Sequence, residues 1–156
     1  MEQEIVLNAH NKQEEPRMHS AEHLLNGTMV KMFGCKRSRN THIERKKSKC
    51  DYPMSAPLTQ EQLQELENTI NNVISQNLQV SYEYMPASEA EKLYDLDKLP
   101  EDASEMLRIV HIGDYDSCPC VGAHVESTKE IGEFRISSAR YQDGVQRIVY
   151  RLSAPE

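Results

Sequence analysis

The 156-residue chain contains no tryptophan and only two phenylalanines, and aromatic residues make up 6% of it. Because large aromatic side chains are scarce, we expect a mainly aliphatic core to which methionine and tyrosine contribute. Charged residues, at 28%, lie near the globular average and argue against a disordered chain. A chain of this length is expected to form one domain, residues 1–156, with a polar lead-in over residues 1–15.

Long apolar runs are also absent from the sequence. No run approaches the roughly 20 residues that a membrane helix needs, and the first four residues are acidic where a signal peptide would be basic. The four cysteines do not form a secreted disulfide pattern, so reduced thiols or metal ligation are expected instead. Together these absences predict a cytoplasmic protein with no membrane partner.

The hydrophobic pattern predicts an α+β fold, in which helices pack on an antiparallel β-sheet as a two-layer sandwich. A capping-box spacing from Thr59 to Gln62 marks the start of the longest helix. Asp143-Gly144 is typical of a tight hairpin turn. Helices are expected over residues 17–33, 58–77 and 88–94, and strands over 41–44, 49–52, 80–84 (half-buried), 107–112, 133–141 and 145–152. A short edge strand is expected at residues 5–7, and loops at 95–105 and 113–124.

Basic residues are concentrated in one short segment of an otherwise acidic chain. The net charge is −7, yet residues 36–49 hold seven basic residues and one acidic residue. Such a strip could bind a phosphate backbone, or it could be a solvated hairpin rich in lysine. This basic strip consists of Lys36, Arg37, Arg39, Arg45, Lys46, Lys47 and Lys49, and we take it as the candidate set for binding a nucleic-acid backbone.

Two pairs of potential metal ligands are separated by about 100 residues. His19 and His23 are four residues apart in the first predicted helix and therefore project from one face. Cys120 and His124 follow a predicted strand and could supply the other two ligands of a tetrahedral site. Thiolate and imidazole together favour Zn²⁺ over Mg²⁺ or Ca²⁺. The thiol of Cys118 lies two residues earlier and is an alternative to Cys120.

A zinc protease is the obvious competing interpretation. Such an enzyme needs a glutamate directly after the first histidine as general base, and here that position is Ser20. Glu22 precedes the second histidine, and helical geometry predicts that it points about 100° away from the metal-facing side. Ser20 and Glu22 are retained as candidate catalytic residues beside the ligands.

The segments His19–Leu25 and Asp116–Val125 resemble the editing domain shared by alanyl- and threonyl-tRNA synthetases and its freestanding AlaX-type relatives. The similarity covers about residues 15–152. It implies a zinc-dependent hydrolase that removes a wrong amino acid from the 3′ end of tRNA, with His19, His23, Cys120 and His124 as zinc ligands. It also implies that the basic strip is the tRNA-binding set, which would hold the phosphates of the acceptor stem.

What this resemblance implies is an aminoacyl-tRNA deacylase acting in trans, since a synthetase catalytic core does not fit in 156 residues. Serine or glycine attached to an alanine tRNA is the expected substrate. The loop departs from the family pattern, because Val121 replaces a glycine and Ala123 a threonine, which bears on amino-acid specificity and activity. The alternative is a zinc-stabilised tRNA-binding or regulatory module without hydrolase activity.

Overall fold

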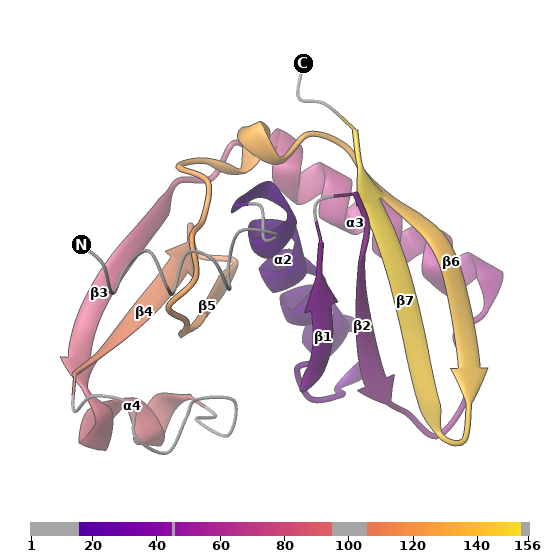
Figure 1. Cartoon of the computed structure of the whole chain (residues 1–156), viewed down its shortest axis with the longest axis horizontal. Coiled ribbons are helices and arrows are strands. Elements are labelled where there is room, and N and C mark those ends of the chain that lie inside the picture. The colour runs from indigo at the N-terminus through magenta and orange to yellow at the C-terminus, as the bar shows by residue number, and fades with distance from the viewer. Residues whose placement is uncertain (1–15, 45, 95–105, 154–156) are drawn as a thin grey trace.

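Two antiparallel sheets stand on either side of a central helix, α2, in a computed structural model that describes residues 16–44, 46–94 and 106–153 (Figure 1). The helices are α2 (Pro16–Phe33), α3 (Gln60–Ser75) and α4 (Ala87–Leu93), with a 3₁₀ turn η1 (Thr128–Ile131). One sheet has the strand order β1-β2-β7-β6 and the other β3-β4-β5. The α+β class is confirmed, with the strands divided between two sheets rather than joined in one. The strands are β1 (Asn40–Ile43), β2 (Ser48–Pro53), β3 (Val80–Pro86), β4 (Met106–Ile112), β5 (Asp116–Pro119), β6 (Phe134–Gln142) and β7 (Val145–Leu152).

Helix α2 is unusual because it is buried on every side. All twelve residues from Met18 to Met29 are buried, and six of them are polar or charged. The apolar residues Leu24, Leu25 and Met29 recur at the spacing of a buried helical stripe and join the main core. Since a buried polar group is costly unless it is hydrogen-bonded, the polar side of α2 requires partners from the rest of the fold.

Helix α3 covers the inner face of the four-stranded sheet, and its start is as predicted. Thr59 and Gln62 form a capping box, each accepting a hydrogen bond from the other's backbone N–H. The side chain of Asn71 binds the backbone of Phe134 twice, by Nδ2 to the carbonyl at 2.8 Å and by Oδ1 from N–H at 2.7 Å. This pair of bonds fixes the start of β6 against α3.

The two hairpins of the four-stranded sheet confirm the predicted strand pairs. Strands β1 and β2 pair antiparallel with Ile43 opposite Ser48. Strands β6 and β7 meet at Asp143 and Gly144, which have φ values of 52° and 78°. Positive φ at both central residues is the requirement of the type I′ turn that an Asp-Gly pair predicts.

The three-stranded sheet differs from expectation in two places. Residues 113–124 were expected to be a loop, but Asp116–Pro119 form β5, which pairs with β4. The segment is too short and polar to show strand periodicity by itself. The expected half-burial of the strand from Val80 is also wrong: β3 is mostly exposed, including Tyr82 and Tyr84. It is an edge strand separated by β4 from β5, the strand that contacts α2.

Three features of the prediction lie outside the described residues: the edge strand at residues 5–7, the acidic loop at 95–105, and Arg45 in the first hairpin turn. Within the described ranges, no helix is both long and apolar enough to cross a membrane.

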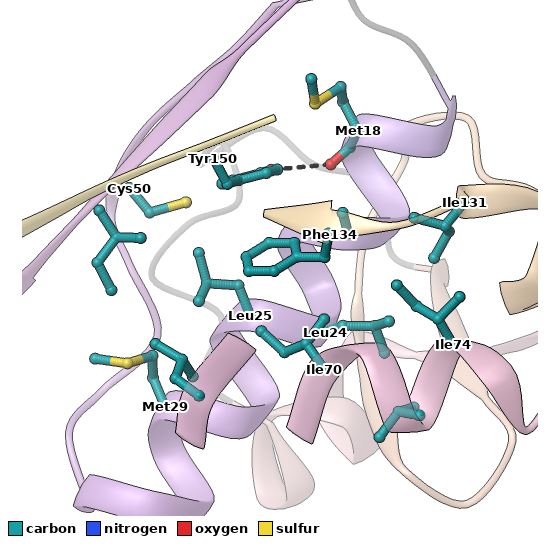
Figure 2. Close-up of a cluster of buried hydrophobic side chains, with 14 of the residues drawn as sticks. Met18, Leu24, Leu25, Met29, Cys50, Ile70, Ile74, Ile131, Phe134 and Tyr150 are labelled. Carbon is teal, nitrogen blue, oxygen red and sulfur yellow. Dashed lines mark hydrogen bonds between the residues drawn. The ribbon is translucent and has the colours of Figure 1, made fainter. Parts of the chain in front are cut away.

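The core forms where α2, α3 and the four-stranded sheet meet (Figure 2). Phe134 and Tyr150 stack with ring centroids 5.0 Å apart. The hydroxyl of Tyr150 donates a hydrogen bond of 3.0 Å to the backbone carbonyl of Met18, the residue before His19, as the dashed line in Figure 2 shows. The sheet therefore fixes the first turn of α2 directly.

Replacing Tyr150 with phenylalanine should lower the free energy of unfolding by about 1 kcal/mol, the net value of a typical buried hydrogen bond. Urea unfolding followed by circular dichroism measures this change. Tyr84→Phe is the matched control, because Tyr84 is 65% exposed, and it should change stability by only a few tenths of a kcal/mol. Equal effects of the two substitutions would contradict the role assigned to Tyr150.

Candidate metal centre

Four side chains from two distant segments converge beside the first turns of α2. His19 and His23 lie one helical turn apart, and Cys120 and His124 come from the segment between β5 and η1. Their potential ligand atoms all lie within 4.8 Å of one another. The ring of His124 stacks on that of His19 at 4.3 Å between centroids and meets His23 at 4.4 Å. The structure therefore brings together the four residues that the sequence selected as ligands.

Arg108 on β4 holds the loop that carries Cys120. Its guanidinium donates to the carbonyl of Cys120 at 2.8 Å and to the carbonyl of Gly122. The backbone N–H of Cys120 returns a bond of 3.1 Å to the Arg108 carbonyl. Arg108 was not predicted to be a site residue, although an arginine within the apolar strand from Leu107 was a signal that its guanidinium has a local partner.

Gly122 lies directly against the ring of His19. A Cβ at this position would be 2.0 Å from Cε1 and 2.3 Å from Nδ1 of His19, so no other residue fits without moving the ring. The backbone N–H of Gly122 also donates to Sγ of Cys120 at 3.4 Å. The loop thus needs glycine here because its backbone packs on a histidine.

The orientation of His124 is set by Ser20. The Ser20 hydroxyl oxygen lies 2.9 Å from Nδ1 of His124 and also accepts the N–H of Val125 at 3.1 Å. Nε2 of His124 is buried and, among the described residues, is the one buried side-chain nitrogen or oxygen without a hydrogen-bond partner. A buried imidazole nitrogen without a hydrogen-bond partner is expected of a metal ligand rather than of an ordinary core histidine.

His19 connects the two halves of the cluster. Its Nδ1 lies 3.2 Å from the carbonyl of Ala123, and its Nε2 lies 3.2 Å from Sγ of Cys120. Burial raises the pKa of the Cys120 thiol, but the hydrogen bond and positive charge of His19 outweigh burial and lower that pKa overall. Burial, with the charges of His19 and Arg108, lowers the pKa of His124 to about 3. Cysteine binds a metal as the thiolate and histidine as the neutral imidazole.

Cys118 belongs to a second, overlapping group with His23 and Asp116. Its Sγ lies 3.4 Å from Nδ1 of His23, and it is not among the four converging donors. Burial raises the pKa of the Cys118 thiol to about 12, so it remains protonated at neutral pH. These differences favour Cys120 over Cys118 as the thiolate of the four-ligand group.

Arg37, one residue of the basic strip, points inward to Asp116. The two side chains form a bidentate ion pair with N–O distances of 2.7 and 3.1 Å. Burial opposes the charge of Arg37, but the Asp116 carboxylate more than compensates and raises the pKa of the guanidinium. Oδ2, which accepts the longer of the two bonds from Arg37, also faces Nδ1 of His23 at 3.8 Å. Gly27 leaves room for this carboxylate, since a Cβ there would be 2.7 Å from Oδ1.

Glu22 was expected to point away from the metal-facing side, and this expectation is wrong. Its Oε1 lies 3.9 Å from Nε2 of both His19 and His23. Glu22 is three residues after His19, so the two side chains are neighbours on the helix surface. The rotation of about 100° that separates Glu22 from His23 therefore does not take Glu22 away from the cluster. Asn26 holds the other oxygen, Oε2, with a hydrogen bond of 3.0 Å.

The rest of the basic strip lies at the surface. Lys36, Arg39, Lys46 and Lys47 are exposed, Lys49 is partly exposed, and Arg45 lies outside the described residues. Nothing in this arrangement tests RNA binding, so the tRNA-binding role of the strip stays a prediction.

Three imidazole nitrogens and one thiolate suit tetrahedral Zn²⁺.

Residues 107–149 match the family model described as the threonyl and alanyl tRNA synthetase second additional domain. The chain is also similar to alanine–tRNA ligases of three organisms. It is 34% identical to that of Coxiella burnetii over 134 residues, 85% of this chain, and 32% identical to that of Staphylothermus marinus over 96% of this chain. The Thermococcus kodakarensis ligase is 30% identical over 86%.

These matches confirm the resemblance to the synthetase additional domain. The chain spans only 15–17% of the length of the ligases that it matches. Their shared name therefore describes much larger proteins, of which this chain resembles one part.

Substituting Gly122 with alanine should remove bound zinc, because the new Cβ cannot fit beside the His19 ring. Zinc content after dialysis, measured by atomic absorption, checks this. Val121→Ala is the matched control: Val121 is the neighbouring residue, it is 83% exposed, and its truncation should leave the zinc content unchanged. Full retention of zinc by Gly122→Ala would contradict the close approach of loop and ring.

Proposed function

We propose that this chain is a zinc-dependent aminoacyl-tRNA deacylase, which acts in trans to hydrolyse serine or glycine from mischarged alanine tRNA. The observation that carries the proposal is the convergence of His19, His23, Cys120 and His124 within 4.8 Å, in a chain that resembles the synthetase additional domain. These four side chains would hold Zn²⁺. When bound, the ion would supply a polarising charge for the ester carbonyl and a more acidic water.

The supporting residues keep the donor nitrogens directed at one point. Ser20 can accept the N–H at Nδ1 of His124, which leaves Nε2 with its lone pair toward the centre. The Ala123 carbonyl does the same for His19 by accepting from Nδ1. Ser20 is already bound to Val125 and His124, so we assign it a positioning role rather than contact with the substrate.

Glu22 is the residue best placed to move a proton. A chain of hydrogen bonds fixes it: Tyr52 OH donates to Oδ1 of Asn26 at 2.6 Å, and Nδ2 of Asn26 donates to Oε2 of Glu22 at 3.0 Å. This leaves Oε1 directed at the two histidine Nε2 atoms. We assign to Oε1 the proton released when water attacks the aminoacyl ester, a general-base role suited to a buried carboxylate.

The loop that differs from the family pattern forms the outer side of the centre. Val121 is 83% exposed and directly follows Cys120, so its side chain can contact an incoming substrate. Ala123 contributes its carbonyl to His19 but has no hydroxyl to offer. We therefore expect the amino-acid preference to depend on an apolar contact at Val121 rather than on a hydrogen bond from residue 123.

A second function is favoured by the number of donors. Four protein ligands fill a tetrahedral zinc ion, which is the arrangement of structural sites, whereas catalytic sites keep one position open. On this reading the chain is a zinc-stabilised tRNA-binding or regulatory module. Hydrolysis by the proposed route would require one of the four ligands to yield its position to water or substrate.

Zinc-loaded protein should release serine, glycine or alanine from mischarged tRNA, and His23→Ala should abolish release because the site loses a ligand. Deacylation is measured with tRNA carrying each radiolabelled amino acid. His111→Asn is the control: His111 lies on β4, binds Ser117 and Glu83, and should be dispensable. If wild-type protein retains zinc and leaves every mischarged tRNA intact, the module interpretation replaces the hydrolase.

The Glu22→Gln variant separates proton transfer from metal retention. It keeps the shape of the side chain and a bond to Asn26, so zinc content should match that of wild type. The deacylation rate should fall about 10²- to 10⁴-fold, the usual contribution of a general base. Single-turnover deacylation and zinc analysis on the same preparation measure both quantities. Unchanged rates would remove Glu22 from the chemistry, and loss of zinc would show that it supports the metal.

A further inference from the structure

The outer face of the four-stranded sheet carries basic side chains from β2 and from the hairpin of β6 and β7, which are far apart in the sequence. On β2 and β7, Cys50, Ile148 and Tyr150 point into the core, so the alternating residues Lys49 and Arg147 point outward. Arg140 on β6 is directly opposite Arg147 on β7. The C-terminal hairpin thus adds two arginines to a face that the sequence had linked only to residues 36–49.

A hollow of about 220 Å³ lies on this face. Four cationic residues line it against the single carboxylate of Glu44, which is itself 2.6 Å from Nε2 of His42. Among the residues that the structure describes, no carboxylate lies within ion-pairing distance of Lys49 or Arg140. The cationic lining residues are Lys47, Lys49, Arg140 and Arg147, with the Ser138 hydroxyl beside them.

A second hollow, of about 260 Å³, lies next to the first. Its lining combines charged and polar residues with two apolar ones: Lys36, Arg37, Arg39, Asn40, Asp51, Pro53 and Val145. Asp51 and Arg147 form a bidentate ion pair with distances of 2.8 and 2.9 Å, and each of the two lines one hollow. The ion pair therefore lies between the two hollows, the first lined mainly by basic residues and the second by basic and apolar residues together.

The second hollow is linked to the metal centre through Arg37. This residue lines the hollow, and its guanidinium binds both oxygens of Asp116, of which Oδ2 faces Nδ1 of His23 at 3.8 Å. A polyanion lying in the hollow would therefore be close to the residues that support the centre. The basic surface starts beside the site and continues across the sheet.

We infer that the two hollows form one docking surface for the phosphate backbone of an RNA, in which Arg140 and Lys49 contact phosphates and Arg147 orders the surface through Asp51. This inference rests on the proposed function, since it concerns the tRNA that would present its 3′ end to the metal centre. With a net charge of −7, the rest of the molecule repels a polyanion, so the binding energy must come from a local face such as this.

The chemistry of the face favours RNA over a lipid surface. Proteins that lie on membranes combine basic residues with large apolar side chains that enter the lipid. The large exposed apolar residues of the described chain include none from β1, β2, β6 or β7. The hollows are lined by side chains with hydroxyl, ammonium and guanidinium groups, which are groups that bind the phosphate oxygens of nucleic acids.

The test compares the Lys49→Gln/Arg140→Gln double variant with a matched double variant, Lys92→Gln/Lys129→Gln, which removes two exposed lysines from α4 and η1. Binding of the full chain to uncharged tRNA is measured by filter retention at several salt concentrations. The first variant should bind about tenfold more weakly at low salt, and its salt slope should fall by about 2, one per lost phosphate contact. The matched variant should resemble wild type.

Zinc content and hydrolysis of a serine ester of adenosine, which lacks the tRNA body, should be unchanged in both double variants. Equal tRNA affinity and salt slope in all three proteins would overturn the docking surface, as would absence of tRNA binding by wild type. Loss of binding to anionic phosphatidylserine vesicles, with tRNA binding retained, would assign the face to a membrane instead. A wild-type protein that binds tRNA through this face but hydrolyses nothing would leave the surface standing and remove the deacylase proposal.

Discussion

The burial of a polar helix face is the constraint on which the centre depends. Helix α2 places six polar or charged residues in the interior, and each must find a partner or cost about 1–3 kcal/mol. Ser20 binds Val125, Thr28 binds the carbonyl of Leu24, and Asn26 binds Glu22. Within the part of the chain that the structure describes, the one buried side-chain nitrogen or oxygen without a hydrogen-bond partner is Nε2 of His124. The exception lies where three imidazoles and a thiolate meet, which gives it a chemical explanation as a ligand atom.

Two chains of interactions meet at His23 from opposite sides. From one side Arg37 binds Asp116, which faces Nδ1 of the ring. From the other, Tyr52 and Asn26 fix Glu22, whose carboxylate faces Nε2. Both chains begin on segments that pack against α2 rather than on α2 itself, so the ring is held by tertiary structure. This explains how a cluster assembled from segments about 100 residues apart in the sequence is held in one geometry.

Features set by neighbouring residues could be predicted from the sequence, whereas contacts between distant segments could not. The spacing of His19 and His23 follows from helical periodicity, and the Asp143-Gly144 turn from backbone preference, so both were accessible. The pairing with Cys120 and His124 came from ligand chemistry and family resemblance. Strand β5, the grip of Arg108 on the loop and the inward turn of Arg37 depend on neighbours distant in sequence. Glu22 was misjudged because its direction was judged from the neighbouring His23, whereas its position three residues after His19 places it beside that histidine.

The two uses of positive charge in residues 36–49 have different physical requirements. A charge that stabilises a buried carboxylate must itself be removed from water, and Arg37 meets that need with a side chain 22% exposed and both oxygens of Asp116 engaged. A charge that binds phosphate must stay accessible, as Lys36 and Lys47 do. Since Arg37 lies between the exposed basic residues Lys36 and Arg39, one short segment can serve both the centre and the surface. Any polyanion held by those neighbours therefore lies next to the guanidinium that holds Asp116 toward His23, so docking and the geometry of the centre share a residue.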